Sequence, residues 1–479
     1  MMMKFYVGKV EQHIMICVGG CILFLYLTIV RQREFEHVEL VCLWILLSLV
    51  GFALEDTGRF AGAELDTSKT SLKNRYWIDI DTGFLPKDNL ERLPTYFEPW
   101  ETIIDRLAEL NRERRLVKEI DRMPALNPNR LLRDGRELRR AYVVLAMLTQ
   151  SYVHGSSVPW WRLRDENDHG QRSRGGDKTE SDLVTIVPKQ LAIPFDWCCR
   201  QLDLPRVIVA AATDLWNVTF DKDTTAISTN VAEIGRFRLI SSFTGTESEH
   251  YFHATPAAMH RVFSTVLLRV LRAPSAIMND DVGDVEALCL EIADVLRTFR
   301  VIFREGAKRI DPSTFYEIYR PLLKGFDDAS RPIRLTKSDG RTEAVVAGGP
   351  SAGQSSMIIM LDALLGIEHA CSAVAFQREM VERYIPAPHR RLLHDFCDAL
   401  VESGNIRDYL KLKTTTDAAK SASLREAFNG CIGAYADFRH YHLSIASRYL
   451  RATQTGTGKS TFRVLLREII DRTKRARAS

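Results

Sequence analysis

Apolar residues recur at helical spacing over most of the chain. The clearest runs are residues 136–155, 257–310, 355–385 and 421–450, where apolar side chains return every three or four positions. No run of strictly alternating apolar residues is long enough to indicate a large sheet. The pattern therefore predicts a mostly α-helical fold.

Changes of composition along the chain predict three parts. Residues 1–70 form an N-terminal extension, residues 71–225 a small α-rich domain, and residues 226–479 a large helical bundle. Helical bundles commonly hold cofactors between facing helices, so the large domain is the expected place for a site. The charged, glycine-rich residues 162–182 predict a surface insertion or a disordered loop.

The N-terminal extension contains two apolar runs, residues 14–30 and 40–54. The first run is at the lower length limit of a membrane-spanning helix, about 17 residues, and the second is shorter. The runs predict either a membrane anchor, with Arg31 and Arg33 on its cytoplasmic side, or two apolar helices that pack on the body or extend outside it. The expected location is cytoplasmic, with or without that anchor.

Charge and cysteine content narrow the function classes. The formal net charge of +4 is small for 479 residues, which gives no reason to expect a nucleic-acid partner. The nine cysteines are scattered, without the paired C-x-x-C motifs of a zinc site and without the pattern of a disulfide framework. A reducing compartment is the default.

The stretch T-G-T-G-K-S-T, residues 455–461, has the ending of a phosphate-binding P-loop. The first glycine of that motif would fall at position 453, which is Thr453. A P-loop also follows a buried strand, whereas the residues before this one are typical of a helix. The pattern favours a flexible loop of small residues over a nucleotide site.

One histidine lies on the apolar face of the predicted helix 424–450. His442 falls four residues after Phe438 and three before Ile445, while His440 is turned toward the polar side. A histidine in this place is either a core residue with a satisfied ring or a metal ligand.

A buried acid adds to the interest of this helix. Asp362 lies inside the apolar stretch 355–366, and a buried carboxylate needs a partner. Asp362 and Arg439 are candidates to support a metal-binding histidine through its second ring nitrogen. The alternative is an Asp–Arg pair that does not involve the histidine.

Several stretches between Tyr76 and Phe462 form a recognisable set. They are I-D-T-G-F-L-P, L-P-x-x-F-E-P-W, V-P-K-Q-L-A-I-P-F, L-D-L-P, G-G-P-S-A-G-Q-S-S, D-x-L-L-G-I, R-Y-I-P-A-P-H-R-R-L-L, L-R-E-A-F-N-G-C and F-R-H-Y-H-L-S-I-A-S-R-Y. Together they resemble the indoleamine 2,3-dioxygenase family of haem enzymes, and S-A-G-Q-S-S and R-x-Y-H-L are the most specific. The first seventy residues lie outside the resemblance.

The resemblance implies a haem b cofactor in the large domain. His442 matches the family's proximal iron ligand, and Arg439 and Asp362 match residues that support the haem on that side. The small-residue loop Pro350–Gln354 matches the loop above the haem, where small side chains let backbone approach a ligand. Its members expected at the haem are Ser351, Ala352 and Gly353.

The resemblance also implies a substrate pocket on the distal side. Arg320 matches the residue that pairs the carboxylate of the amino acid, a task suited to a guanidinium. Thr457 matches the residue of a mobile Gly-Thr-Gly loop that closes over the substrate. The other expected pocket residues are Phe315, Tyr251, Phe252, Thr255 and Thr213.

The implied reaction adds both atoms of dioxygen across the indole 2,3-bond of L-tryptophan or a related indoleamine, giving N-formylkynurenine at the start of the kynurenine route. Besides O2, an electron donor keeps the iron ferrous. Iron performs the difficult step, so no catalytic acid or base is expected of the protein, and His250, His253 and His260 are interpreted as structural or surface residues.

Some positions depart from the family pattern. Ala210 stands where an aromatic residue can occur, Lys459 replaces a glycine, and Thr213 and Asp214 stand where pocket residues are usually apolar. Asp214 is compatible with repelling a carboxylate, pairing with the substrate ammonium, or facing away. The alternatives are a relative that oxidises a modified tryptophan, a non-catalytic haem protein, and a membrane-tethered scaffold without a cofactor.

Overall fold

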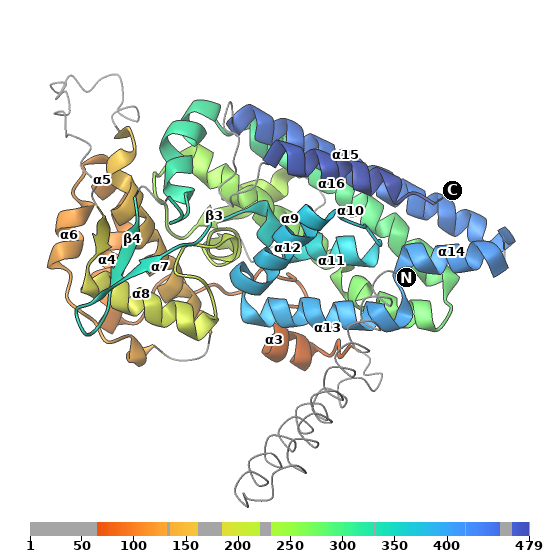
Figure 1. Cartoon of the computed structure of the whole chain (residues 1–479), viewed down its shortest axis with the longest axis horizontal. Coiled ribbons are helices and arrows are strands. Elements are labelled where there is room, and N and C mark those ends of the chain that lie inside the picture. Colours follow the sequence, from red (N-terminus) through yellow and green to blue (C-terminus); the bar gives the residue numbers. More distant parts are fainter. Residues whose placement is uncertain are drawn as a thin grey trace, which may run out of the picture. The chain divides into compact units, whose positions relative to one another are not determined.

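Three long helices form the centre of the large helical region. In this computed structural model, α10 (Val282–Lys308) packs against both α9 (Glu247–Met278) and α15 (Ala418–Leu450), and α16 (Phe462–Arg475) lies along α15 (Figure 1). The structure describes residues 65–131, 135–160, 184–220, 231–328, 331–416, 418–450 and 462–478. The predicted mostly α-helical fold is confirmed.

Capping side chains set where the central helices begin. The hydroxyl of Thr246 accepts a hydrogen bond from the backbone N–H of Glu249, and the carboxylate of Asp281 does the same for Asp284. Glu249 is itself buried, and its carboxylate accepts bonds from the backbone N–H groups of Phe243 and Thr244. The start of α9 is therefore held against the segment before it.

A group of shorter helices covers one side of this core. They are α11 (Ser356–Leu364), α12 (Cys371–Tyr384), α13 (Ala387–Ser403) and α14 (Ile406–Thr416). The predicted helical region 355–385 is divided in two at Gly366, which has a φ of +65° that favours glycine. α13 packs against α9 and α11, and α14 packs against α15.

The preceding part of the chain forms a second group of helices. A buried ion pair joins two of them, because Arg140 Nε on α7 donates to Glu101 Oε1 on α4 over 3.0 Å. Here the elements are η1 (Thr95–Phe97), α4 (Glu98–Asp105), α5 (Leu107–Arg112), α6 (Leu116–Arg122), η2 (Pro128–Arg130), α7 (Arg136–His154), η3 (Gly155–Ser157) and α8 (Lys189–Leu202). α3 (Lys69–Tyr76) precedes them in the chain but packs against α13.

Strands are few and short in the described part of the chain. β4 (Ile333–Thr336) pairs in parallel with β1 (Thr185–Val187) and antiparallel with β5 (Thr342–Val345). β2 (Val218–Phe220) pairs antiparallel with β3 (Phe237–Leu239). The remaining short helical turns are η5 (Ala211–Leu215), η6 (Val231–Arg236), η7 (Thr314–Tyr319), η8 (Arg320–Leu323) and η9 (Ala352–Gln354).

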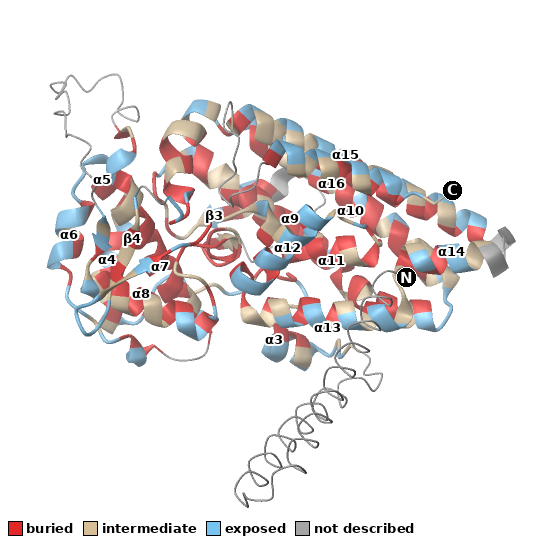
Figure 2. Ribbon diagram, in the orientation of Figure 1, coloured by how far each residue is buried: buried red, intermediate tan, exposed pale blue. Residues whose placement is uncertain are grey.

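Buried residues follow the inward faces of the helices (Figure 2). Residues 64–479 form one compact unit, and a division of it near residue 225 stays a prediction. Among the described residues, none of the helices combines the length and the apolar character needed to cross a membrane. The apolar runs 14–30 and 40–54 and the insertion 162–182 lie outside the described residues.

Candidate active site

A cavity of about 400 Å³ lies inside the helical region, within the range of roughly 300–1,000 Å³ that is common for ligand and cofactor sites. Its lining comes from α9, α10, α11, α12, α13, α15 and α16 and from the turns η5, η7, η8 and η9. η5 and η7 are both π-helical, a form often found at functional sites. Most of the lining side chains are apolar.

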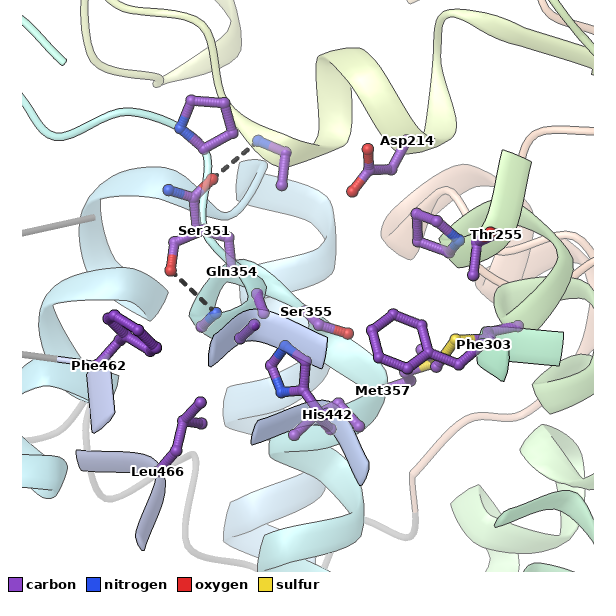
Figure 3. A pocket seen from close by; sticks show the side chains of 18 of the residues that line it. Asp214, Thr255, Phe303, Ser351, Gln354, Ser355, Met357, His442, Phe462 and Leu466 are labelled. Carbon is purple, nitrogen blue, oxygen red and sulfur yellow. Dashed lines mark hydrogen bonds between the residues drawn. The ribbon is translucent and has the colours of Figure 1, made fainter. Parts of the chain in front are cut away.

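His442 lines this cavity from α15, and His440 is exposed. Burial lowers the pKa of His442 to about 4, with a smaller contribution from Arg439. The imidazole is therefore neutral at pH 7, the form that binds metal ions. Phe303 of α10 packs edge-on to its ring, with 5.6 Å between ring centroids. Figure 3 shows the ring of His442 directed into the pocket.

Asp362 and Arg439 form a buried ion pair between α11 and α15. Asp362 also accepts a hydrogen bond from the Tyr435 hydroxyl at 2.8 Å and lies 2.8 Å from Nε2 of His369. Burial raises the pKa of Asp362, but Arg439, His369 and Tyr435 outweigh it and hold that pKa below its usual range. The acid is therefore ionised.

The sequence left open whether the Asp362–Arg439 pair involves the ring of His442. The hydrogen bonds of Asp362 among the described residues go to Arg439, Tyr435 and His369, and none goes to His442. Arg439 also donates to Thr473 of α16. The pair therefore joins α11, α15 and α16 around the base of His442 without touching its ring.

The small-residue loop at Pro350–Gln354 lies along the same cavity. Gln354 fixes it, since its Oε1 accepts from the backbone N–H of Ala210 at 2.8 Å (Figure 3). Its Nε2 also donates to the Gly349 carbonyl at 3.0 Å. At Gly353 the need for a small residue has a local cause: a Cβ there would lie 2.6 Å from the ring of Phe376.

Arg320 and a group of aromatic rings line another part of the cavity. The side chain of Arg320 is buried, and burial lowers its pKa from the usual value. Phe315 of η7 packs on Phe252 of α9, with 4.8 Å between centroids and 35° between planes. These rings offer a flat apolar surface beside a cation.

Thr213 and Thr255 are both buried and both line the cavity. Tyr251 differs from its prediction, because it does not line the cavity. Its ring packs under Arg309, 4.8 Å from the guanidinium carbon. Successive residues on a helix point about 100° apart, so Phe252 faces the cavity while Tyr251 faces outward.

Sequence reasoning missed one set of residues. His253 and Asp214 both line the cavity. Nδ1 of His253 lies 2.6 Å from Oδ1 of Asp214, and Nε2 of His253 contacts the hydroxyl of Tyr319. Asp214 faces the cavity, which decides between the alternatives for its direction. An acid at a position that is usually apolar was a usable signal, but nothing in the sequence identified His253 as its partner.

Most of the other predicted site residues meet in this one cavity. Thr457 and Lys459 of the expected closing loop lie outside the described residues, so the lid stays a prediction. The predicted residues that line the cavity are His442, Arg439, Asp362, Ser351, Ala352, Gly353, Arg320, Phe315, Phe252, Thr255 and Thr213.

Comparison with known proteins agrees with this arrangement. The sequence model of the family described as indoleamine 2,3-dioxygenase matches residues 72–462. The chain belongs to the indoleamine 2,3-dioxygenase family. It is therefore a dioxygenase, and the match covers every described residue that lines the cavity except Leu465, Leu466 and Ile469 of α16.

The chain is similar to several known proteins. It is 29% identical over 386 residues to indoleamine 2,3-dioxygenase 2 of Mus musculus, covering 80% of this chain and 85% of the relative. It is 29% identical over 401 residues to a 6-hydroxytryptophan 2,3-dioxygenase of Fusarium equiseti, covering 82% and 88%. It is also 24% identical over 414 residues to a myoglobin of Haliotis madaka, covering 84% and 98%.

Proposed function

We propose that this chain is a haem-dependent dioxygenase that inserts both atoms of O2 across the indole 2,3-bond of L-tryptophan or a related indoleamine. With L-tryptophan the product is N-formylkynurenine. One observation carries the proposal: a single cavity joins the neutral imidazole of His442, the buried guanidinium of Arg320 and the aromatic rings of Phe252 and Phe315. Names of relatives that act on indoleamines support the substrate class.

The residues present fit a haem. His442 offers a neutral ring nitrogen to an iron, and no described residue hydrogen-bonds that ring. The surrounding surface is mostly apolar, and Phe303, Phe462 and Leu466 are among the side chains that line it (Figure 3). The Asp362–Arg439 pair holds the helix that carries His442 in place. When bound, the haem iron supplies the redox chemistry that dioxygen requires.

The protein's own part in this reaction is binding, orientation and exclusion of water. Arg320 pairs with the carboxylate of the substrate, because a charge brought into an apolar cavity needs a partner. Phe252 and Phe315 pack against the indole. An electron donor from outside the protein keeps the iron ferrous.

The test uses the full-length protein purified with haem supplied. We expect a Soret band and formation of N-formylkynurenine from L-tryptophan under ascorbate and methylene blue. Absence of a Soret band at full haem supply would contradict the cofactor assignment. Formation of no product from any indoleamine by haem-loaded protein would contradict the reaction.

A second candidate is a haem protein that binds oxygen reversibly without turnover. The similarity to a protein named myoglobin favours it. The same preparation separates the two, since reversible oxygenation with no consumption of any indoleamine is expected only of the second.

A further inference from the structure

Three residues that are distant in sequence form a buried hydrogen-bonded chain at the edge of the cavity. Asp214 comes from η5, His253 from α9 and Tyr319 from η7. Nδ1 of His253 lies 2.6 Å from Oδ1 of Asp214, and its Nε2 contacts the hydroxyl of Tyr319. His253 is 2% exposed and Tyr319 is fully buried. The proposed carboxylate clamp and aromatic surface do not use this chain.

The direction of one hydrogen bond follows from the acid. A carboxylate only accepts, so Nδ1–H of His253 donates to Asp214, while Nε2 bonds to the hydroxyl of Tyr319. Burial raises the pKa of Tyr319 well above its usual value, so that hydroxyl keeps its proton at pH 7. The tyrosine and histidine therefore orient the carboxylate.

The carboxylate of Asp214 has one engaged and one free oxygen. The hydroxyl of Thr213 also donates to Oδ1, over 2.9 Å, so both donors reach the same atom. Oδ2 has no hydrogen-bond partner among the described residues. The side chain is 23% exposed and lines the cavity, and Figure 3 shows the carboxylate directed into it. Oδ2 of Asp214, a hydrogen-bond acceptor, therefore faces the region where the proposed substrate binds.

This acceptor and the carboxylate clamp come from different elements, η5 for Asp214 and η8 for Arg320. The carboxylate of Asp214 contributes a rise to the pKa of His260 and to that of Tyr319. The pKa of Arg320 is lowered by burial and raised to a smaller extent by Tyr316. In an amino acid the ammonium and carboxylate are attached to one carbon atom. We take a substrate held by Arg320 to present its ring, and not its ammonium, to Asp214.

The ring of tryptophan offers one hydrogen-bond donor, the indole N–H. L-tryptophan and its ring-hydroxylated forms all carry that N–H, and the family pattern has an apolar residue at the position of Asp214. The N–H therefore does not require an acid here. Against an unsubstituted benzo ring, Oδ2 would lose water without gaining a donor.

We propose that Asp214, oriented by His253 and Thr213, accepts a hydrogen bond from a hydroxyl group on the indole ring. The preferred substrate class is then a ring-hydroxylated tryptophan. This inference rests on the proposed function, because it assumes that an indole amino acid occupies the cavity. Discrimination of this kind is strong. When a substrate analogue lacks the hydroxyl group, the polar group of the site that would bond to that hydroxyl stays without a partner.

The experiment uses the haem-loaded full-length protein with L-tryptophan, 5-hydroxy-L-tryptophan and 6-hydroxy-L-tryptophan. Both kcat/KM and the dissociation constant, from the change of the Soret band, are measured for each. We expect at least one hydroxylated substrate to exceed L-tryptophan by roughly 10- to 100-fold, the range of a hydrogen bond to a charged group. Asp214→Val and the isosteric Asp214→Asn should each reduce that ratio about tenfold or more.

Two further variants sharpen the test. His253→Phe should lower the same ratio by disturbing the orientation of Asp214, as expected of a positioning residue. Asp294→Asn is a matched control, because Asp294 is 76% exposed on α10 and pairs with Arg297 one turn along. It should leave the ratio at its wild-type value.

Three results would overturn the inference. The first is equal or better use of L-tryptophan by the wild type, and the second is an unchanged ratio in both Asp214 variants. The third is an equal loss for all three substrates, which would assign Asp214 to a group that all three share, the indole N–H or the ammonium. If no indole is turned over, the proposed function fails, and the ratio of dissociation constants still decides the role of Asp214.

Discussion

Thr255 of α9 occupies the space that a side chain at Gly306 of α10 would need. A Cβ at Gly306 would lie 1.9 Å from Thr255 Oγ1 and 3.1 Å from its Cβ. The hydroxyl of Thr255 donates to the Tyr251 carbonyl at 2.7 Å, so it is not free to turn aside without losing that bond. The close approach of α9 to α10 depends on this glycine, and α9 carries Phe252 and His253 into the cavity.

Gly306→Ala should therefore destabilise the protein. Overpacking of this kind costs about 1–3 kcal/mol, and the free energy of unfolding from denaturant titration measures it. Gly430→Ala is the matched control, because Gly430 is exposed on α15 and a Cβ there meets nothing within 4 Å. That variant should be more stable than the wild type by about 0.4–1 kcal/mol. Equal stability of Gly306→Ala and the wild type would show that the two helices separate without cost.

Loss of the cavity-facing histidine should abolish haem binding. His442→Ala removes a neutral imidazole that lines the cavity, whereas His440→Ala removes an exposed side chain two residues away. Haem content, measured as the pyridine haemochrome, should fall to background in the first variant and stay at the wild-type value in the second. Equal haem content in the two would refute the assignment of His442.

A further variant addresses another histidine of the cavity. His260 of α9 also lines the cavity, and its Nδ1 has no hydrogen-bond partner among the described residues. His260→Ala should retain haem. Loss of haem in this variant alone would move the ligand to α9.

The sequence predicted those features that depend on local periodicity. The apolar stripe of residues 424–450 repeats over many turns, so it placed His442 and His440 on opposite sides of one helix. Tyr251 was the exception, since adjacent aromatic residues on a helix do not share a face. The long helices and the near absence of sheet among described residues follow from the same signal.

Contacts between distant segments were beyond such reasoning. Asp214, His253 and Tyr319 belong to three different elements, and no spacing in the sequence relates them. Likewise, Gln354 holds the small-residue loop through the backbone of Ala210, which its side-chain type does not reveal. These contacts form only when the helices pack, so they require the tertiary structure.

Acid should destabilise the protein through its buried neutral histidines. Burial lowers the pKa of His389 to about 3, with smaller contributions from His260 and Arg139. The unfolded chain takes up a proton near pH 6.5, so the stability that is present above pH 6.5 is lost as the pH falls toward 3. Each pH unit in that window costs about 1.4 kcal/mol for this one residue.

The pH dependence is tested with His389→Gln. The free energy of unfolding is measured at pH 7, 6 and 5 for this variant and the wild type. The variant should be less stable at pH 7 and should lose less stability on acidification. An identical slope in the two proteins would contradict the contribution of His389.

Arg320 should control the affinity for the carboxylate of the substrate. Losing the partner of a buried charge costs about 2–5 kcal/mol, roughly 30- to several-thousand-fold in affinity. Arg320→Ala should therefore raise the KM for L-tryptophan steeply while haem content stays at the wild-type value. Arg320→Lys should restore only part of the affinity, because an ammonium lacks the planar fork of a guanidinium.

Tryptamine supplies the control for this prediction, since it has the indole and the amine but no carboxylate. It should be a poor substrate of the wild type, and Arg320→Ala should lower its turnover little further. The change in turnover of L-tryptophan relative to that of tryptamine measures the loss of the carboxylate contact. A general disturbance of η8 or of the neighbouring Phe315 would affect both substrates alike. Normal use of L-tryptophan by Arg320→Ala would place the carboxylate at another cation, and an equal loss with tryptamine would make Arg320 a structural residue of the cavity.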